Sequence, residues 1–246
     1  MFPRQRRHVL YFLEHAREYH RCFIDTEVDM SAVKLARHQH RARGEQVGTV
    51  AILAKATALA IRKHPDANVV IDHGFFPRAR RLPSIDCKIV VDREIAAARS
   101  VAGAIITGAD AMALGTIQET IERYRHEPAE TIPELRQLMA FQRLPVWLGR
   151  TLHRTASRSL RMRAKMEGSY ALTSIGHQPV TAAYPAIANT LSFVAGGIFD
   201  RVVVRDGEPA VRPMMQFTLA FDHAAMDASL AMEVLCEAKQ LLETWS

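Results

Sequence analysis

The C-terminal end of the chain restricts the fold most, because a strand, a polar turn and a helix follow one another there. In segment 214–222 strongly apolar residues recur at a period of two, which is typical of a β-strand; they are Met215, Phe217, Leu219 and Phe221. Asp227 then stands at the N-cap position of a helix that we expect from Ala228 to about Leu242. A helix with one apolar face needs a partner layer. The strand and the helix are therefore expected to pack in one core.

Upstream of this unit, we expect helices mainly in the first half of the chain and a run of strands in the last third. The helices are expected over 31–43, 49–63 and 116–124, with a short one within 4–20. The expected strands are 22–29, 69–71, 85–91, 99–107, 170–174 and 190–196, and a hairpin over 201–212 turns at Asp206-Gly207. This order predicts an α+β fold with a mixed β-sheet.

Composition favours one domain over residues 1–246. The chain is 48% hydrophobic, which is enough to bury a sizeable core. Its three cysteines are scattered, so we expect neither a disulfide framework nor a zinc motif. No apolar run approaches the roughly 20 residues of a membrane span, and the N-terminal residues lack the apolar region of a signal peptide. We therefore expect a cytoplasmic protein.

Positive charge is concentrated in one part of the sequence. Residues 135–166 contain eight basic residues and no acidic residue, whereas the whole chain has a net charge of +6. The rest of the chain is close to neutral, which argues against a general nucleic-acid binder. We interpret 135–166 as a basic amphipathic insertion within the domain.

The turn after the long strand carries the strongest chemical signal. His223 follows the strand, and Asp227 begins the helix four residues later. Histidine is suited to proton transfer near neutral pH, and a strand end presents a side chain rigidly. Judged by spacing alone, the same residues also fit an ordinary turn with a helix cap. Both interpretations stay open at this point.

These residues resemble the active-site signature of a known family. Asp222-His223, three residues, then Asp227 is similar to the signature of the 2-oxo acid dehydrogenase dihydrolipoyl acyltransferase (E2) catalytic domain. Chloramphenicol acetyltransferase shares the fold and the catalytic histidine of that family. Segment 172–176, Leu-Thr-Ser-Ile-Gly, resembles the family's strand that carries a serine or threonine hydroxyl, with Thr173 at the matching position.

The resemblance covers about residues 20–243 and implies both a fold and a reaction. The implied fold is a chloramphenicol acetyltransferase-like two-layer sandwich, assembled as a homotrimer with each site between two subunits. The resemblance leaves open whether trimers assemble further. The implied reaction moves an acyl group between coenzyme A and an acceptor, with His223 as general base. A hydroxyl of Thr173, or of its neighbour Ser174, would stabilise the oxyanion.

The two aspartates of the signature have supporting roles under this resemblance. Asp227 is expected to hold the loop by an ion pair or hydrogen bond, and Asp222 to be structural. The chain departs from the family at Ala224, where arginine is usual, and at Ala228, where glycine is usual. Neither change removes a proposed catalytic atom, but both put a classical lipoyl-domain partner in doubt.

The sequence contains no lipoylation pattern, so we expect a stand-alone catalytic domain. Its substrate would be acyl-coenzyme A, and its acceptor either a free molecule or a lipoyl group on a separate protein. A competing function is a non-catalytic E2-like trimeric scaffold that recruits partners through residues 135–166.

Several roles are open for the basic segment 135–166. Four arginines recur at spacings that would put them on one helix face; they are Arg150, Arg154, Arg158 and Arg161. The segment fits a solvated face of a packed helix, a surface for a membrane or an anionic partner, or a docking site for coenzyme A phosphates.

Metal, nucleotide and hydrolase sites find little support. The early histidines have no cysteine or carboxylate at ligand spacing, so no metal is expected; they are His8, His15, His20, His38 and His40. The glycines form no phosphate-loop pattern, and a Gly-x-Ser-x-Gly motif is missing.

Overall fold

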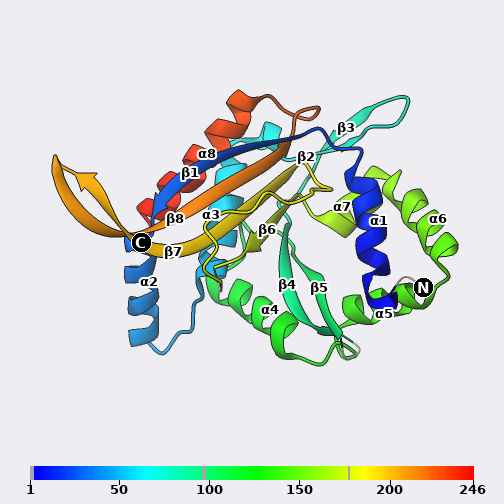
Figure 1. Ribbon diagram of the computed structural model, residues 1–246, viewed down its shortest axis with the longest axis horizontal. Coiled ribbons are helices and arrows are strands. Elements are labelled where there is room, and N and C mark those ends of the chain that lie inside the picture. The colour runs from blue at the N-terminus through cyan, green and yellow to red at the C-terminus, as the bar shows by residue number, and fades with distance from the viewer. Residues whose placement is uncertain (1–2, 96–97, 177) are drawn as a thin grey trace.

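The protein is built around a six-stranded mixed sheet (Figure 1). The computed structural model describes residues 3–95, 98–176 and 178–246. The strand order is β1-β8-β7-β6-β4-β5, and β6 runs parallel to both of its neighbours while the other pairs are antiparallel. The strands are β1 (Arg21–Asp29), β4 (Cys87–Ile95), β5 (Ala98–Ile106), β6 (Tyr170–Ser174), β7 (Leu191–Arg205) and β8 (Glu208–Asp222). The predicted mixed sheet is confirmed.

Four helices form the second layer; they are α2 (Ser31–Ala42), α3 (Thr49–Lys63), α4 (Leu114–His126) and α8 (Ala228–Glu243). Their apolar faces meet strand side chains such as Phe193, Phe217 and Leu219, which are fully buried. Burial of apolar surface is the main favourable contribution to folding. α3 and α8 lie behind β1 and β8 in Figure 1, so the helix after the His223 turn is anchored in the core.

A long ribbon of β7 and β8 projects beyond the body of the molecule (Figure 1). We predicted separate strands at 190–196 and 201–205, but β7 is continuous. A register shift between Ala195 and Ile198 absorbs the two glycines that suggested the interruption. Asp206 and Gly207 both have positive φ, as a tight hairpin turn requires, so the predicted turn is confirmed.

The basic segment folds into helices that pack against the start of the chain. They are α5 (Pro133–Arg143), α6 (Val146–Ser157) and α7 (Leu160–Glu167), and α6 lies beside α1 (Arg7–Ala16). Pro145 separates α5 from α6, whereas Gly149 lies inside α6. Glycine is needed there for close packing, because a Cβ would lie 2.5 Å from the hydroxyl oxygen of Tyr11 on α1.

Of the four arginines expected on one helix face, Arg150, Arg154 and Arg158 follow one another along α6 and its C-cap, whereas Arg161 belongs to α7. Arg150 forms an ion pair of 2.6 Å with Glu14 on α1. Arg163 on α7 is only 2% exposed, and its guanidinium donates to backbone carbonyls of two other segments. Two of the eight basic residues of the segment, Arg150 and Arg163, therefore hold it to the rest of the fold.

A small hairpin of β2 (Val69–Asp72) and β3 (Arg78–Arg81) stands apart from the main sheet. Only β2 was predicted, since β3 consists of arginines and an alanine without an apolar pattern. Short 3-10 turns at Arg4–Arg6 and Pro65–Ala67 complete the described elements. Within the described ranges, no helix has the length and apolar character to cross a membrane.

Candidate active site

A buried carboxylate fixes the loop that carries His223. Asp222 is the last residue of β8 and is fully buried. Its Oδ1 accepts hydrogen bonds from the backbone N–H groups of His20, at 3.0 Å, and Ala224, at 3.3 Å. Its Oδ2 lies 2.6 Å from Nε2 of His73. The backbone N–H of His223 donates to the carbonyl oxygen of His20, so the loop is tied to the start of β1 and to the β2–β3 turn.

The same contacts keep Asp222 ionised. Burial acts to raise the pKa of its carboxyl, but the hydrogen bond and charge of His73 oppose this. Together with the N–H groups of His20 and Ala224, they lower the pKa below its usual 3.8. An ionised acceptor makes stronger hydrogen bonds than a neutral one. Asp222 therefore anchors the loop from inside the protein.

His223 itself is exposed, and its ring centre lies 5.9 Å from that of Phe221. Asp227 is the N-cap residue of α8 as predicted, but its exposed side chain makes no capping hydrogen bond. The ion pair or hydrogen bond that we expect from Asp227 does not form between residues described in the single chain. Asp222, and not Asp227, makes the hydrogen bonds that hold the loop.

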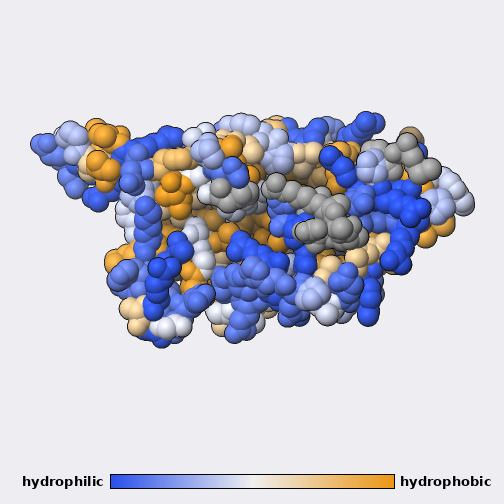
Figure 2. All heavy atoms as spheres, turned by 60° about the horizontal axis from the view of Figure 1, so that its bottom comes forward, coloured by the Kyte–Doolittle hydropathy of each residue, from blue (hydrophilic) through white to orange (hydrophobic). Residues whose placement is uncertain are grey.

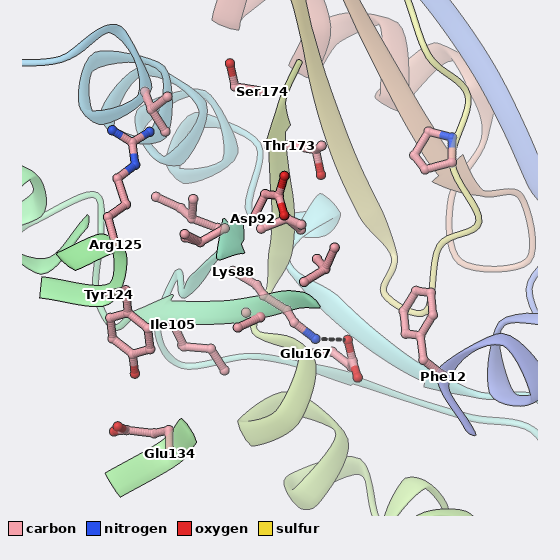
Figure 3. Close-up of a pocket in the computed structure, with 18 of the residues that line it drawn as sticks. Phe12, Lys88, Asp92, Ile105, Tyr124, Arg125, Glu134, Glu167, Thr173 and Ser174 are labelled. Carbon is pink, nitrogen blue, oxygen red and sulfur yellow. Dashed lines mark hydrogen bonds and ion pairs between the residues drawn. The ribbon is translucent and has the colours of Figure 1, made fainter. Parts of the chain in front are cut away.

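Thr173 and Ser174 lie in a large groove at the end of β6. The groove has a volume of about 2280 Å³, and residues of β4, β5, α5 and α7 form its walls. In Figure 3 the hydroxyl of Thr173 is turned into the groove, whereas Ser174 extends in another direction. Figure 2 shows a hollow with hydrophobic residues gathered inside it. A largely apolar groove with a few polar groups is typical of a small-molecule site.

A single chain does not bring Thr173 and His223 together. Thr173 pairs with Val194 of β7, which in turn pairs with Thr218 of β8, so these three lie level across the sheet. His223 comes five residues after Thr218. Two strand spacings and a rise of about 3.3 Å per residue put Thr173 and His223 roughly 20 Å apart. A site that uses both must combine two copies of the chain.

The groove wall contains an ion pair that the sequence did not single out. Lys88 of β4 and Glu167 at the end of α7 approach to 2.6 Å, and their side chains are 20% and 8% exposed (Figure 3). The pair fixes α7 against β4, beside the strand that carries Thr173. Its partners are 79 residues apart in the sequence, so no local spacing could reveal it.

His20, His73 and Asp222 also form a group with metal-ligand chemistry, in which one atom of each lies within 4.8 Å of the others. The 2.6 Å between His73 and Asp222 is a hydrogen-bond distance, however, and the carboxylate already accepts from two backbone groups. Loop anchoring explains the group without an ion. His73 was missed because it lies in a turn 149 residues before Asp222.

Solved structures define the class of fold. The chain superimposes on chloramphenicol acetyltransferase with a TM-score of 0.53 at 13% identity, over 98% of this chain and 96% of the other. A probable dihydrolipoamide acetyltransferase from Listeria monocytogenes 4b F2365 gives a TM-score of 0.72 at 20% identity, covering 98% of this chain and 92% of that one. The predicted chloramphenicol acetyltransferase-like fold is confirmed.

Sequence comparison identifies the more particular resemblance. Residues 132–246 match the family model of the 2-oxoacid dehydrogenases acyltransferase catalytic domain, and this range includes Thr173 and His223. The dihydrolipoyllysine-residue succinyltransferase component of the 2-oxoglutarate dehydrogenase complex from Bartonella vinsonii subsp. berkhoffii is 26% identical over 226 residues. The match covers 88% of this chain and 46% of that relative. The chain thus spans about half the length of the curated relatives that it matches, and its resemblance to E2 catalytic domains is confirmed.

Proposed function

We propose that this protein is a coenzyme A-dependent acyltransferase in which His223 is the general base. One observation carries the proposal: an exposed histidine stands at the end of β8 on a buried carboxylate anchor, inside the segment that matches the acyltransferase catalytic domain. The relatives compared above are named as a succinyltransferase and a probable acetyltransferase of dihydrolipoyl groups. We extend acyl transfer, the reaction class in both names, to this chain. Which acyl group it transfers is a question for the assay below.

The chemistry requires a base because a thiol has a pKa of about 8.5 and is mostly protonated near neutral pH. His223 takes the thiol proton while the sulfur forms a bond to the carbonyl carbon of the acyl thioester. As the tetrahedral intermediate collapses, the bond to the original sulfur breaks, and that sulfur receives the proton from the imidazolium of His223. A positioned base of this kind contributes about 10²–10⁴ in rate.

The oxyanion of the intermediate needs a hydrogen-bond donor. We assign this role to the hydroxyl of Thr173 from a second copy, with Ser174 as the neighbouring alternative. The inward position of Thr173 in the groove supports the assignment, as does its separation from His223 of the same chain. One well-placed donor contributes about 10²–10³ in kcat. Asp227, exposed in the single chain, is left with a supporting role at the same interface.

The working form is proposed to be a homotrimer, which can assemble further. Val202, Val204 and Val211 are each more than 60% exposed on the projecting ribbon. Val202 lies opposite Val211 in the β7–β8 register, so the three side chains share one face. An exposed aliphatic face on a projecting element is typical of an interaction surface. A second copy of the chain is the partner we propose for this face, because the proposed active site combines His223 of one copy with Thr173 of another.

Release of free thiol from short acyl-coenzyme A donors tests the proposed activity, with dihydrolipoamide, amines and alcohols as acceptors. Wild type is expected to turn over at least one pair, and His223→Ala to lower kcat by about 10²–10⁴. His38→Ala changes an exposed histidine on α2 and is expected to keep full activity. Turnover that His223→Ala leaves unchanged contradicts the assigned role.

A second candidate is a non-catalytic trimeric scaffold that recruits partners through residues 135–166. Trp147 is 68% exposed and Leu152 is 47% exposed on α6, which favours contact with another molecule there. The same assay separates the candidates. A folded oligomer that neither turns over nor binds coenzyme A supports the scaffold.

A further inference from the structure

A second cavity adjoins the anchor of the His223 loop. It has a volume of about 650 Å³, and α1, α6, α7 and the β2–β3 turn enclose it. His73 lines this cavity and also bonds to Asp222, the residue before His223. The cavity shares only His153 with the groove that contains Thr173. It is therefore a separate space next to the proposed active site.

Positive charge exceeds negative charge in this cavity, since six arginines and three carboxylates line it. Three arginines are held by those carboxylates: Arg150 by Glu14, Arg163 by Glu18 and Asp72, and Arg78 by Asp72. Arg17, Arg154 and Arg158 are exposed and have no acidic partner among the residues that the structure describes. Three guanidinium groups are thus available to an anion.

Three buried polar atoms of the lining residues also lack a hydrogen-bond partner in the described structure. They are Oη of Tyr11, Nε2 of His15 and Nδ1 of His73. Tyr11 is 1% exposed, His15 6%, and the His73 side chain 9%. Buried polar atoms are rarely left unpaired because the loss of hydration is costly. Tyr11, His15 and His73 thus place polar atoms without a protein partner in the wall of the cavity, beside the three arginines.

Phosphate fits both observations. Arginine binds phosphate oxygens through paired N–H donors, and its charge compensates that of the anion. The hydroxyl of Tyr11 is a further hydrogen-bond donor in the wall of the cavity. The cavity volume lies within the range usual for small-molecule sites. A cationic ligand would add to the charge excess and leave the three arginines unpaired.

We propose that this cavity binds the phosphate of a small organic phosphate beside the His223 loop. Coenzyme A carries phosphates and is one source of this group; that assignment rests on the proposed function. A different small phosphate is the other source. Phosphate binding itself is independent of the proposed acyltransferase activity.

Calorimetric titration of the full chain tests the proposal, with inorganic phosphate and with adenosine 3′,5′-bisphosphate, which resembles the nucleotide end of coenzyme A. Saturable binding is expected, and Arg154→Ala with Arg158→Ala is expected to weaken it about tenfold or more. Arg136→Ala with Arg143→Ala removes the same charge from exposed positions of the same segment outside the cavity. This control is expected to bind like wild type.

Equal weakening in both double variants would overturn the proposal, as would the lack of saturable binding of either probe. Circular dichroism and Tm measured without ligand verify that each variant is folded. Tighter binding of the bisphosphate, together with competition against acyl-coenzyme A, assigns the cavity to coenzyme A. Equal binding of the two probes assigns it to a separate phosphate. If phosphate binds but acyl transfer is absent, the proposed function fails while the cavity assignment stands.

Discussion

At the scale of single residues, one buried carboxylate connects segments that are far apart in the sequence. Asp222 joins the start of β1, the β2–β3 turn and the loop of His223 through its hydrogen bonds. Removing a buried acceptor leaves its donors unpaired, which costs more than the net value of the bond. The position of His223 therefore depends on a side chain that is buried inside the protein.

We predict that Asp222→Asn lowers the free energy of unfolding by about 1–3 kcal/mol at neutral pH, because one hydrogen-bond partner becomes a donor. Glu130→Gln is the matched control, since Glu130 is exposed and forms no hydrogen bond or ion pair with a residue that the structure describes, and a change below about 0.5 kcal/mol is expected. Urea denaturation measures both variants. Equal losses would show that Asp222 is not the anchor.

The effect of Asp222 on stability depends on pH. Its pKa is lowered in the folded protein, whereas an unfolded aspartate has a pKa of about 3.9. Its contribution is therefore present above about pH 4 and is lost as the pH falls below that value. The stability difference between wild type and Asp222→Asn is expected to shrink in that range. A difference that stays constant from neutral pH to about pH 3 would contradict this.

At the scale of elements, the interface of α1 and α6 contains two histidines, of which His15 is buried and His153 is partly buried. Burial, with added repulsion from Arg163, His153 and His73, lowers the pKa of His15 to about 3, while Asp72 acts in the opposite direction. Burial is also the main cause that lowers the pKa of His153 to about 4. Both rings are thus neutral in the folded protein, whereas an unfolded histidine has a pKa of about 6.5.

This interface is predicted to lose stability in mild acid. As the pH falls below about 6.5, the unfolded chain binds protons that the buried rings do not, so the free energy of unfolding decreases. His15→Leu removes one such group and is expected to make stability less dependent on pH between about 6.5 and 5. His38→Leu, at an exposed position on α2, serves as the control. Identical pH dependence in wild type and His15→Leu would contradict the prediction.

At the scale of the whole molecule, sequence patterns predicted the parts in which sequence neighbours are also spatial neighbours. The strand at 214–222 and the helix that begins at Ala228 follow from local periodicity. The break between α6 and α7 could not be predicted in this way, because residues 157–160 contain no proline or glycine. The contact of His73 with Asp222 also escaped prediction, since folding alone brings these distant residues together.

The candidate site likewise has features that the sequence predicts and features that only the fold reveals. Its residues could be named from a family resemblance. The sheet register was needed to show that Thr173 lies level with Thr218 of β8, well before the end of the strand that carries His223. Sequence pattern carries no information about which copy supplies which group. The proposed composite site therefore rests on the fold as well as on the family resemblance.

Mixing two inactive variants tests the composite site most directly. His223→Ala and Thr173→Ala chains carry different tags, are co-expressed, and are purified as mixed oligomers for the thiol-release assay. In every trimer that carries both tags, one of the three interfaces brings an intact His223 to an intact Thr173. We predict recovery of about one third of wild-type activity from variants that are each about 10²-fold or more weaker alone. If both groups act within one chain, no intact site can form, and mixing will recover no activity.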